Sequence, residues 1–135
     1  MTQKVGKDVA QSEFERFVTA MALDISTDGM SPDDIRSLEK TQKTFLDAVM
    51  NGSLVVNDKG EPVFTPVASS PSSAITFAEP TGAALIARDQ KKKDHDVEKS
   101  IATLAQMTNE PEARYRAMPN RDLRVCTSIM LLFLA

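Results

Sequence analysis

The segment that most constrains the fold is Ile75–Gly82, with the sequence ITFAEPTG. Ile75 and Phe77 alternate with smaller or polar residues, which is the two-residue period of a half-buried strand. Pro80 has no N–H to donate to a sheet and restricts the residue before it to extended backbone, so the strand must end there. Thr81 then suits the N-cap of a helix. A strand, a proline and a helix therefore follow one another just past the middle of the chain.

Two helices are expected before this segment. The first carries a capping-box pattern at Ser12–Glu15 and then apolar residues at i, i+3, i+4 and i+7. It is predicted to run from Ser12 to about Leu23, behind a mobile polar start at residues 1–10. The second is predicted between Ser31 and Asn51, because serine followed by proline starts a helix and Asn-Gly ends one. Together they form an αα-hairpin.

The loop Asp24–Met30 between these helices has the oxygen-bearing side chains and the glycine of the first half of an EF-hand calcium loop. That site needs a bidentate glutamate at its twelfth position, and this chain has Ile35 there. His95, the only histidine, stands between two aspartates, but adjacent side chains point in different directions. We therefore expect no metal site.

A β-hairpin is predicted next, with strands near Leu54–Val56 and Glu61–Thr65 and a turn that ends at Gly60. Pro62 indicates that its strand lies at an edge or is short. A hairpin alone is marginally stable, so the strand that begins at Ile75 is the expected third member. The Ser-rich residues 67–74 between them are predicted to be a flexible linker.

Helices are predicted over Asp96–Met107 and Glu112–Ala117, with a last helix that starts at Asn120. This last helix is apolar nearly all round towards its end, so it is either central in the core or packed against another chain. The sequence thus predicts a mostly helical α+β protein, with an N-terminal αα-hairpin, a small antiparallel three-strand sheet and a C-terminal helical region. It divides into residues 1–66, the linker and residues 75–135, or else forms one compact domain.

Composition excludes several classes of function. The net charge is −3, and the short run Lys91–Lys93 is flanked by acidic residues, so nucleic acid is not an expected partner. The single cysteine, Cys126, excludes an internal disulfide and is expected to be a buried, inert thiol. We find no apolar run of the roughly 18 residues that a membrane span needs and no signal-peptide pattern, so we expect a soluble, intracellular protein.

The chain also lacks a pattern for catalysis. The only histidine is poorly placed as the base of a triad, and the five glycines are scattered rather than gathered in a phosphate-binding loop. Paired carboxylates such as Asp33 and Asp34 are explained by helix starts. We therefore expect no enzyme activity, no catalytic residue and no cofactor.

Four segments of the C-terminal half occur in a recognisable order: Ile75–Gly82, Ile101–Thr108, Glu110–Glu112 and Met118–Leu123. A strand that ends in Glu-Pro-Thr runs into a helix. A helix of small and apolar residues, a Pro- and Glu-containing segment and a Met-x-x-x-Asp-Leu step before a final apolar helix follow. This order resembles the small tail assembly chaperones of long-tailed bacteriophages and related prophages.

The resemblance implies a non-enzymatic chaperone in the bacterial host cytoplasm. Such proteins coat the tape measure protein, keep its long helical chain soluble, help to recruit tail tube subunits and are absent from the finished virion. For this chain the implied partners are thus the tape measure and tail tube proteins, with at most weak self-association. In the last helix the candidate contact residues are Leu123, Ile129, Met130 and Phe133, and the alternative is that these four are simply core.

Two other functions stay open at this point. A structural tail component, such as a tube-end or joining protein, would have a similar α+β build and would remain in the virion. A small regulatory or antitoxin-like protein would use the helices within residues 12–51 as a recognition unit. The mixed charges of the second helix, including Asp33 and Asp34 beside Arg36, do not favour phosphate contacts.

Overall fold

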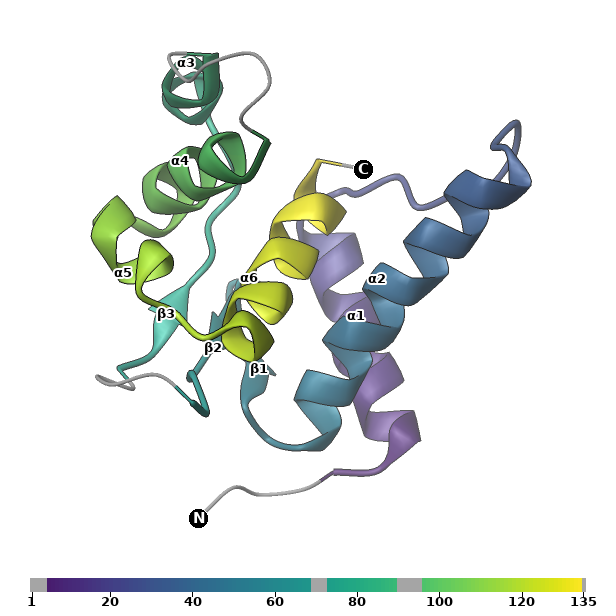
Figure 1. Cartoon of the computed structure of the whole chain (residues 1–135). Coiled ribbons are helices and arrows are strands. Elements are labelled where there is room, and N and C mark those ends of the chain that lie inside the picture. The colour runs from purple at the N-terminus through teal and green to yellow at the C-terminus, as the bar shows by residue number, and fades with distance from the viewer. Residues whose placement is uncertain (1–4, 69–72, 90–95, 135) are drawn as a thin grey trace.

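The computed structural model describes residues 5–68, 73–89 and 96–134. Within them lie six helices and a small three-stranded sheet, and the predicted mostly helical α+β class is confirmed. Helix α6 lies between α1 and α2 on one side and α3, α4 and α5 on the other (Figure 1). The elements are α1 (Lys7–Ala20), α2 (Pro32–Met50), β1 (Leu54–Val56), β2 (Pro62–Phe64), β3 (Ile75–Thr76), α3 (Gly82–Asp89), α4 (Asp96–Thr108), α5 (Glu112–Arg116) and α6 (Asn120–Phe133).

Helix α1 begins earlier than predicted, at Lys7 rather than at Ser12. The prediction of a mobile start was therefore wrong for residues 7–10. Ala10 is fully buried one turn before Phe14, so core packing extends the helix towards its N-terminus. The carboxylate of Glu13 pairs with Arg16, and Ser12 lies inside the helix instead of capping it.

Helix α2 follows the prediction. The Ser31 hydroxyl accepts a hydrogen bond from the Asp34 N–H at 3.1 Å, and Pro32 occupies the first helical position. The helix ends at Met50, before Gly52 with a φ of +86°. A serine cap, a proline at the start and a glycine at the end are local signals, so this helix could be placed from the sequence alone.

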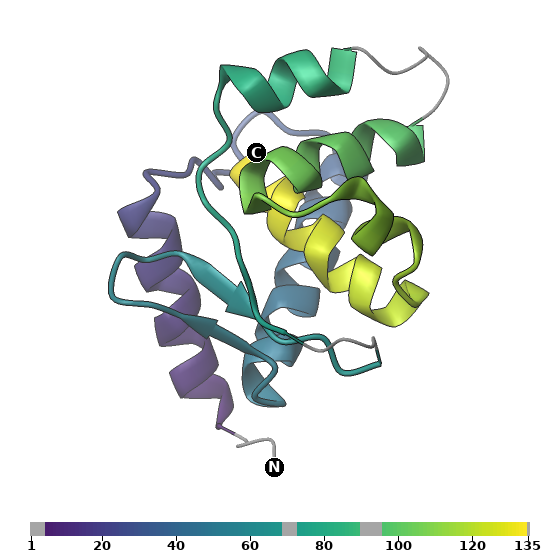
Figure 2. The same cartoon turned by 90° about the vertical axis from the view of Figure 1, so that its left-hand side faces the viewer.

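The predicted three-stranded sheet is confirmed, with both strand pairs antiparallel and the order β1-β2-β3. Of the two outcomes that Pro62 left open, an edge position or a short strand, the structure has the second: β2 is central but only three residues long. Pro62 is the first residue of β2, and its carbonyl accepts the Phe77 N–H at 2.9 Å. A proline at this position lacks only its own N–H, and its carbonyl still accepts a hydrogen bond, so β3 can pair beyond it. Figure 2 shows the hairpin beside α1 and the extended segment that leads from the sheet to α3.

One hydrophobic core contains residues from both halves of the chain. The rings of Phe17 and Phe45 are stacked with their centroids 5.2 Å apart, and the ring of Phe133 meets that of Phe17 edge-on at 5.1 Å. Leu54 and Ile75 of the sheet are buried in the same cluster. The N-terminal helices, the sheet and α6 therefore bury their apolar faces against one another.

The fully buried Asp122 of α6 fixes the start of the connection from β2 to β3. Its Oδ1 accepts the Val67 N–H and its Oδ2 the Ala68 N–H, each at 3.0 Å. Further along, Arg114 donates to the carbonyl of Ser73. The backbone N–H groups of Val67 and Ala68, at the start of the predicted linker, are thus hydrogen-bonded, and residues 69–72 lie outside the described residues.

We predict that Asp122→Asn destabilises the protein. An amide has only one oxygen and would turn its NH₂ group towards a backbone N–H, which leaves one buried donor unpaired. Hydrogen bonds to a charged group contribute roughly 1.5–3 kcal/mol, so urea unfolding should show a loss of about that size. Asp58→Asn in the exposed hairpin turn is the control. Equal stability of the two variants would contradict the role given to Asp122.

A second prediction concerns Gly60, at the end of the hairpin turn. Its φ is +79°, and a Cβ there would lie 2.2 Å from the Cβ of Ala20. Gly29 has a similar φ of +77° with nothing within 4 Å of such a Cβ, so Gly29→Ala measures the backbone cost alone, about 1–2 kcal/mol. Thermal unfolding should show Gly60→Ala to be the more destabilising, because the hairpin must also move away from α1. Similar losses would mean that the turn shifts freely.

Candidate functional site

The two faces of α6 have different surroundings. Cys126, Ile129, Met130 and Phe133 follow an i, i+3, i+4, i+7 pattern and are buried. Leu123, Thr127 and Leu131 recur every four residues on another face, where Leu131 is 47% exposed. We call this second set the outer stripe of α6. The core covers only the first of these faces. The outer stripe is therefore available to pack against another segment or another molecule.

The candidate contact residues predicted from the sequence do not share one environment. Ile129 is fully buried, and Met130 and Phe133 are buried beside it, so these three side chains belong to the core, although Phe133 also lines a small notch at the end of α6. On this face the ring of Phe133 meets that of Phe17 of α1. Leu123 is half-buried and belongs to the outer stripe.

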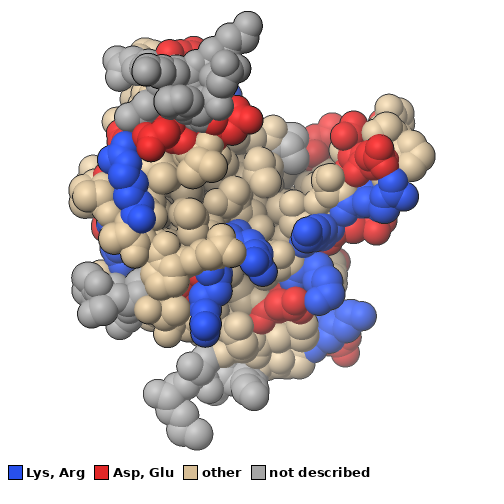
Figure 3. Space-filling model, viewed as in Figure 1, with Lys and Arg blue, Asp and Glu red and all other residues tan. Residues whose placement is uncertain are grey.

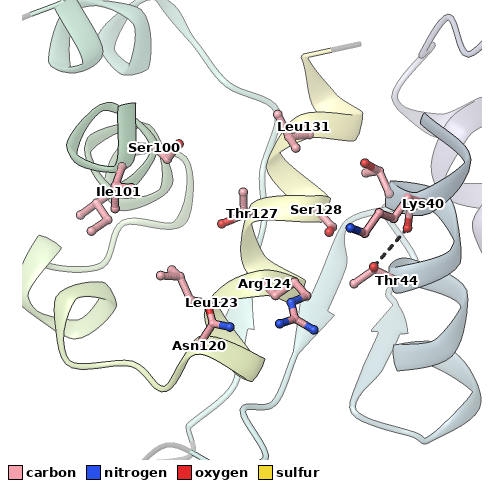
Figure 4. Close-up of a pocket in the computed structure, with 12 residues that line it drawn as sticks. Lys40, Thr44, Ser100, Ile101, Asn120, Leu123, Arg124, Thr127, Ser128 and Leu131 are labelled. Carbon is pink, nitrogen blue, oxygen red and sulfur yellow. Dashed lines mark hydrogen bonds between the residues drawn. The ribbon is translucent and has the colours of Figure 1, made fainter. Parts of the chain in front are cut away.

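A groove with a volume of about 540 Å³ lies along the outer stripe. Helix α6 supplies its floor, and α2 and α4 supply its two walls (Figure 4). Its apolar residues come from α4 and α6, and Val97 at its end is 65% exposed. The lining residues are Lys40, Thr41, Thr44, Val97, Ser100, Ile101, Asn120, Leu123, Arg124, Thr127, Ser128 and Leu131.

The α2 wall is less polar than its composition implies. The Thr41 hydroxyl donates to the carbonyl of Ser37 at 2.9 Å, and the Thr44 hydroxyl donates to the carbonyl of Lys40 at 3.1 Å. Both hydroxyl protons are used within the helix, so the methyl groups and the hydroxyl lone pairs remain for a ligand. This wall can therefore pack against apolar side chains.

Among the described residues that line the groove, all charged side chains are basic. Lys40 and Arg124 are exposed and line it, whereas no carboxylate of the described residues does. Among the described residues neither cation has a partner in an ion pair, unlike Lys43, which pairs with Asp47 at 2.9 Å. In Figure 3 the centre of this face is largely uncharged, with basic side chains below it and to its right, an acidic patch among those at the lower right, and further acidic side chains towards the top and the right-hand tip. The groove is thus apolar with a cationic margin, on a chain whose net charge is −3.

A smaller notch lies where α3 approaches the end of α6. It has a volume of about 250 Å³ and includes Pro80, Leu85 and Leu134. Helix α3 buries only Ala84 and leaves Ile86 exposed on its surface. The notch is about half the size of the groove, and residues 90–95, which follow α3, lie outside the described residues.

Two reactive side chains of the described residues, Cys126 and Tyr115, lie in the core. Cys126 is buried, and burial raises the pKa of its thiol to about 12, which keeps it protonated at neutral pH. Tyr115 is buried and hydrogen-bonded to Thr108, and burial raises the pKa of its hydroxyl. The sequence prediction of a buried cysteine is confirmed.

The described residues also bear on metal binding. Residues 5–68, 73–89 and 96–134 contain no group of three or more His, Cys, Asp or Glu side chains that could hold an ion. In the EF-hand-like loop the Ser26 N–H donates to Asp24 Oδ1 at 3.0 Å, so this carboxylate makes a local turn. His95 and Lys91–Lys93 lie outside the described residues.

Comparison with known proteins adds no relative. No protein-family model, curated protein or solved structure matches the chain. Across the described segments, none of the helices combines the length and the apolar character that crossing a membrane requires. The groove is therefore interpreted from its own residues.

Sequence reasoning missed the residues that make the groove walls. Lys40 and Val97 come from helices far apart in the chain, and no local pattern brings them together. The four-residue spacing of Leu123, Thr127 and Leu131 was the available signal, because it marks a stripe separate from that of Ile129.

We predict that the two faces of α6 differ in their effect on stability. Phe133→Ala should cost roughly 3–5 kcal/mol, because it leaves a cavity against Phe17. Leu131→Ala should cost less than about 1 kcal/mol, because its side chain is half exposed. Chemical denaturation of both variants measures the difference. A large loss for Leu131→Ala would show that the outer stripe is part of the core.

Proposed function

We propose that the protein is a non-enzymatic phage tail assembly chaperone that works in the host cytoplasm, binds the tape measure protein and helps to recruit tail tube subunits. The order of segments from Ile75 to Leu123 supports the family, as a resemblance. The groove on the outer stripe of α6 is the single structural observation that carries the binding function.

The groove suits a helical partner. Amphipathic helices are commonly bound in apolar grooves between helices, with anchor residues at i, i+3, i+4 and i+7. Here the exposed Leu131 and Val97 and the half-buried Leu123 offer such anchors an apolar floor. A tape measure protein, long and helical as the resemblance implies, would present repeated segments of this kind.

The side chains in the groove also suit a binding protein. Its described lining residues include lysine, serine and threonine but no histidine, cysteine, aspartate or glutamate that could activate a hydroxyl group for catalysis. The two groups in the described residues whose pKa is raised most clearly, Cys126 and Tyr115, lie in the core. An enzyme would be expected to place such groups in a cleft instead.

We predict that this chain keeps a co-expressed tape measure protein soluble through the groove. Soluble tape measure protein should be recovered with tagged wild-type chain, and the tail tube protein should join the complex. Leu131→Asp should lower recovery about tenfold, since a charge replaces an apolar contact. Phe133→Asp is unsuitable because it would unfold the core. Val9→Asp, at an exposed residue of α1 outside the groove, is the matched control.

Other outcomes would assign another function. No binding to either tail protein, together with this chain in purified virions by mass spectrometry, would contradict the chaperone and favour a structural tail component. A salt-sensitive shift of DNA in a gel would instead favour a regulatory protein. Equal recovery with Leu131→Asp and Val9→Asp would mean that binding uses a different surface.

A further inference from the structure

We infer that the groove formed by α2, α4 and α6 selects amphipathic helices whose apolar stripe is flanked by aspartate and glutamate, and that Lys40 and Arg124 make the selection. This inference rests on the proposed function for the identity of the natural partner. Beyond that function, it specifies which face of the molecule binds, which charge the bound segment carries and which residues recognise that charge.

The length of the outer stripe sets the length of the contact. Leu123 and Leu131 are eight residues apart on α6, which is about 12 Å along the helix at 1.5 Å per residue. A partner helix laid along this floor is therefore contacted over roughly two turns, which takes three or four apolar residues at i, i+3, i+4 and i+7. One short segment of a long helix fills the groove, so many copies of this chain could bind one partner.

The charged residues that line the groove determine which charge is favoured on the partner helix. Figure 4 shows Lys40 on α2 and Arg124 on α6 beside Thr44, on the side of the groove away from α4. Neither has an ion-pair partner in the described residues, and the lining offers no carboxylate to pair with basic side chains of a ligand. Acidic side chains beside the partner's apolar stripe would be attracted by both Lys40 and Arg124, whereas basic side chains there would be repelled by both.

Other occupants fit less well. Nucleic acid needs several phosphate contacts, and two cations beside an apolar floor supply too few. In a second copy of this chain the net charge of −3 is spread over many surfaces. Its helix α3 has exposed apolar side chains but ends in Arg88 and Asp89, so it does not offer an acidic flank. Exposed ion pairs mainly set specificity and association rate, so the expected signature is charge selection that salt weakens.

The test uses the full chain and two designed helical peptides that share one leucine stripe. One peptide carries glutamate on both flanks and the other carries lysine, and fluorescence anisotropy measures their binding. The glutamate peptide should bind about tenfold more tightly. The preference should shrink as ionic strength rises from about 0.05 to 0.5 M, because the charges become screened.

Substitutions inside and outside the groove test which residues cause the preference for the glutamate peptide. Lys40→Glu with Arg124→Glu should reverse the preference, and Leu131→Asp should weaken both peptides. The matched control is Lys7→Glu with Lys59→Glu, at exposed residues outside the groove. Each pair of substitutions moves the net charge by −4, from −3 to −7, so only position differs. Circular dichroism checks that each variant is folded.

The outcomes separate the inference from the proposed function. Equal binding of the two peptides, a stronger lysine peptide, or the same change in both double variants would overturn the charge selection, even if the tape measure protein is still kept soluble. Selection of the glutamate peptide without any binding of tail proteins would support the groove and contradict the tail function. Concentration-dependent dimers that exclude the peptide would make a second copy the occupant and overturn the inference.

Discussion

The rest of the structure depends on the contact between the rings of Phe17, Phe45 and Phe133. The first two come from the N-terminal helices and the third from the end of α6, so this cluster joins the two ends of the chain. It also determines which way α6 faces. Once Phe133 and Ile129 point into the core, Leu123 and Leu131 must point out, because helical geometry separates the two stripes. The groove is the consequence of that orientation.

Polar contacts then hold the remaining segments against this core. Asp122 is fully buried at the start of α6 and ties down the backbone that leaves β2. At the other end of the same connection, Arg114 contacts Ser73 just before β3. A buried carboxylate is tolerated because two N–H groups replace the water it has lost. The sheet thus keeps its place beside α6 although each strand has at most three residues.

Local chemistry explains which elements were predictable. The cap at Ser31, the turn at Gly60 and the proline after β3 each act within a few residues, and the corresponding elements lie where the sequence placed them. The start of α1 was missed because burial of Ala10, a tertiary effect, extends the helix past its apparent cap. Pro62 alone could not decide whether β2 is an edge strand or only a short one, since its pairing with β3 depends on residues distant in sequence.

The site was harder to predict than the fold. On α6 the apolar residues near the end fill both stripes, so periodicity shows that two faces exist without showing which one meets Phe17. Three of the four candidate contact residues are buried in the core, whereas Leu131 is exposed on the other face. The cationic margin needs Lys40 and Arg124 together, and only the packing of α2 beside α6 makes them neighbours.

Burial of the lone cysteine gives the molecule a built-in reporter. The Cys126 sulfur lies on the inner face of α6, 3.8 Å from the sulfur of Met118, and is fully shielded from solvent. An alkylating reagent can reach it only when α6 separates from the core, so its reaction rate in native buffer measures how often that opening occurs. A partner that bridges α2, α4 and α6 from outside would slow this reaction without touching the sulfur. Occupancy of the groove could then be followed in the natural sequence, with no added label.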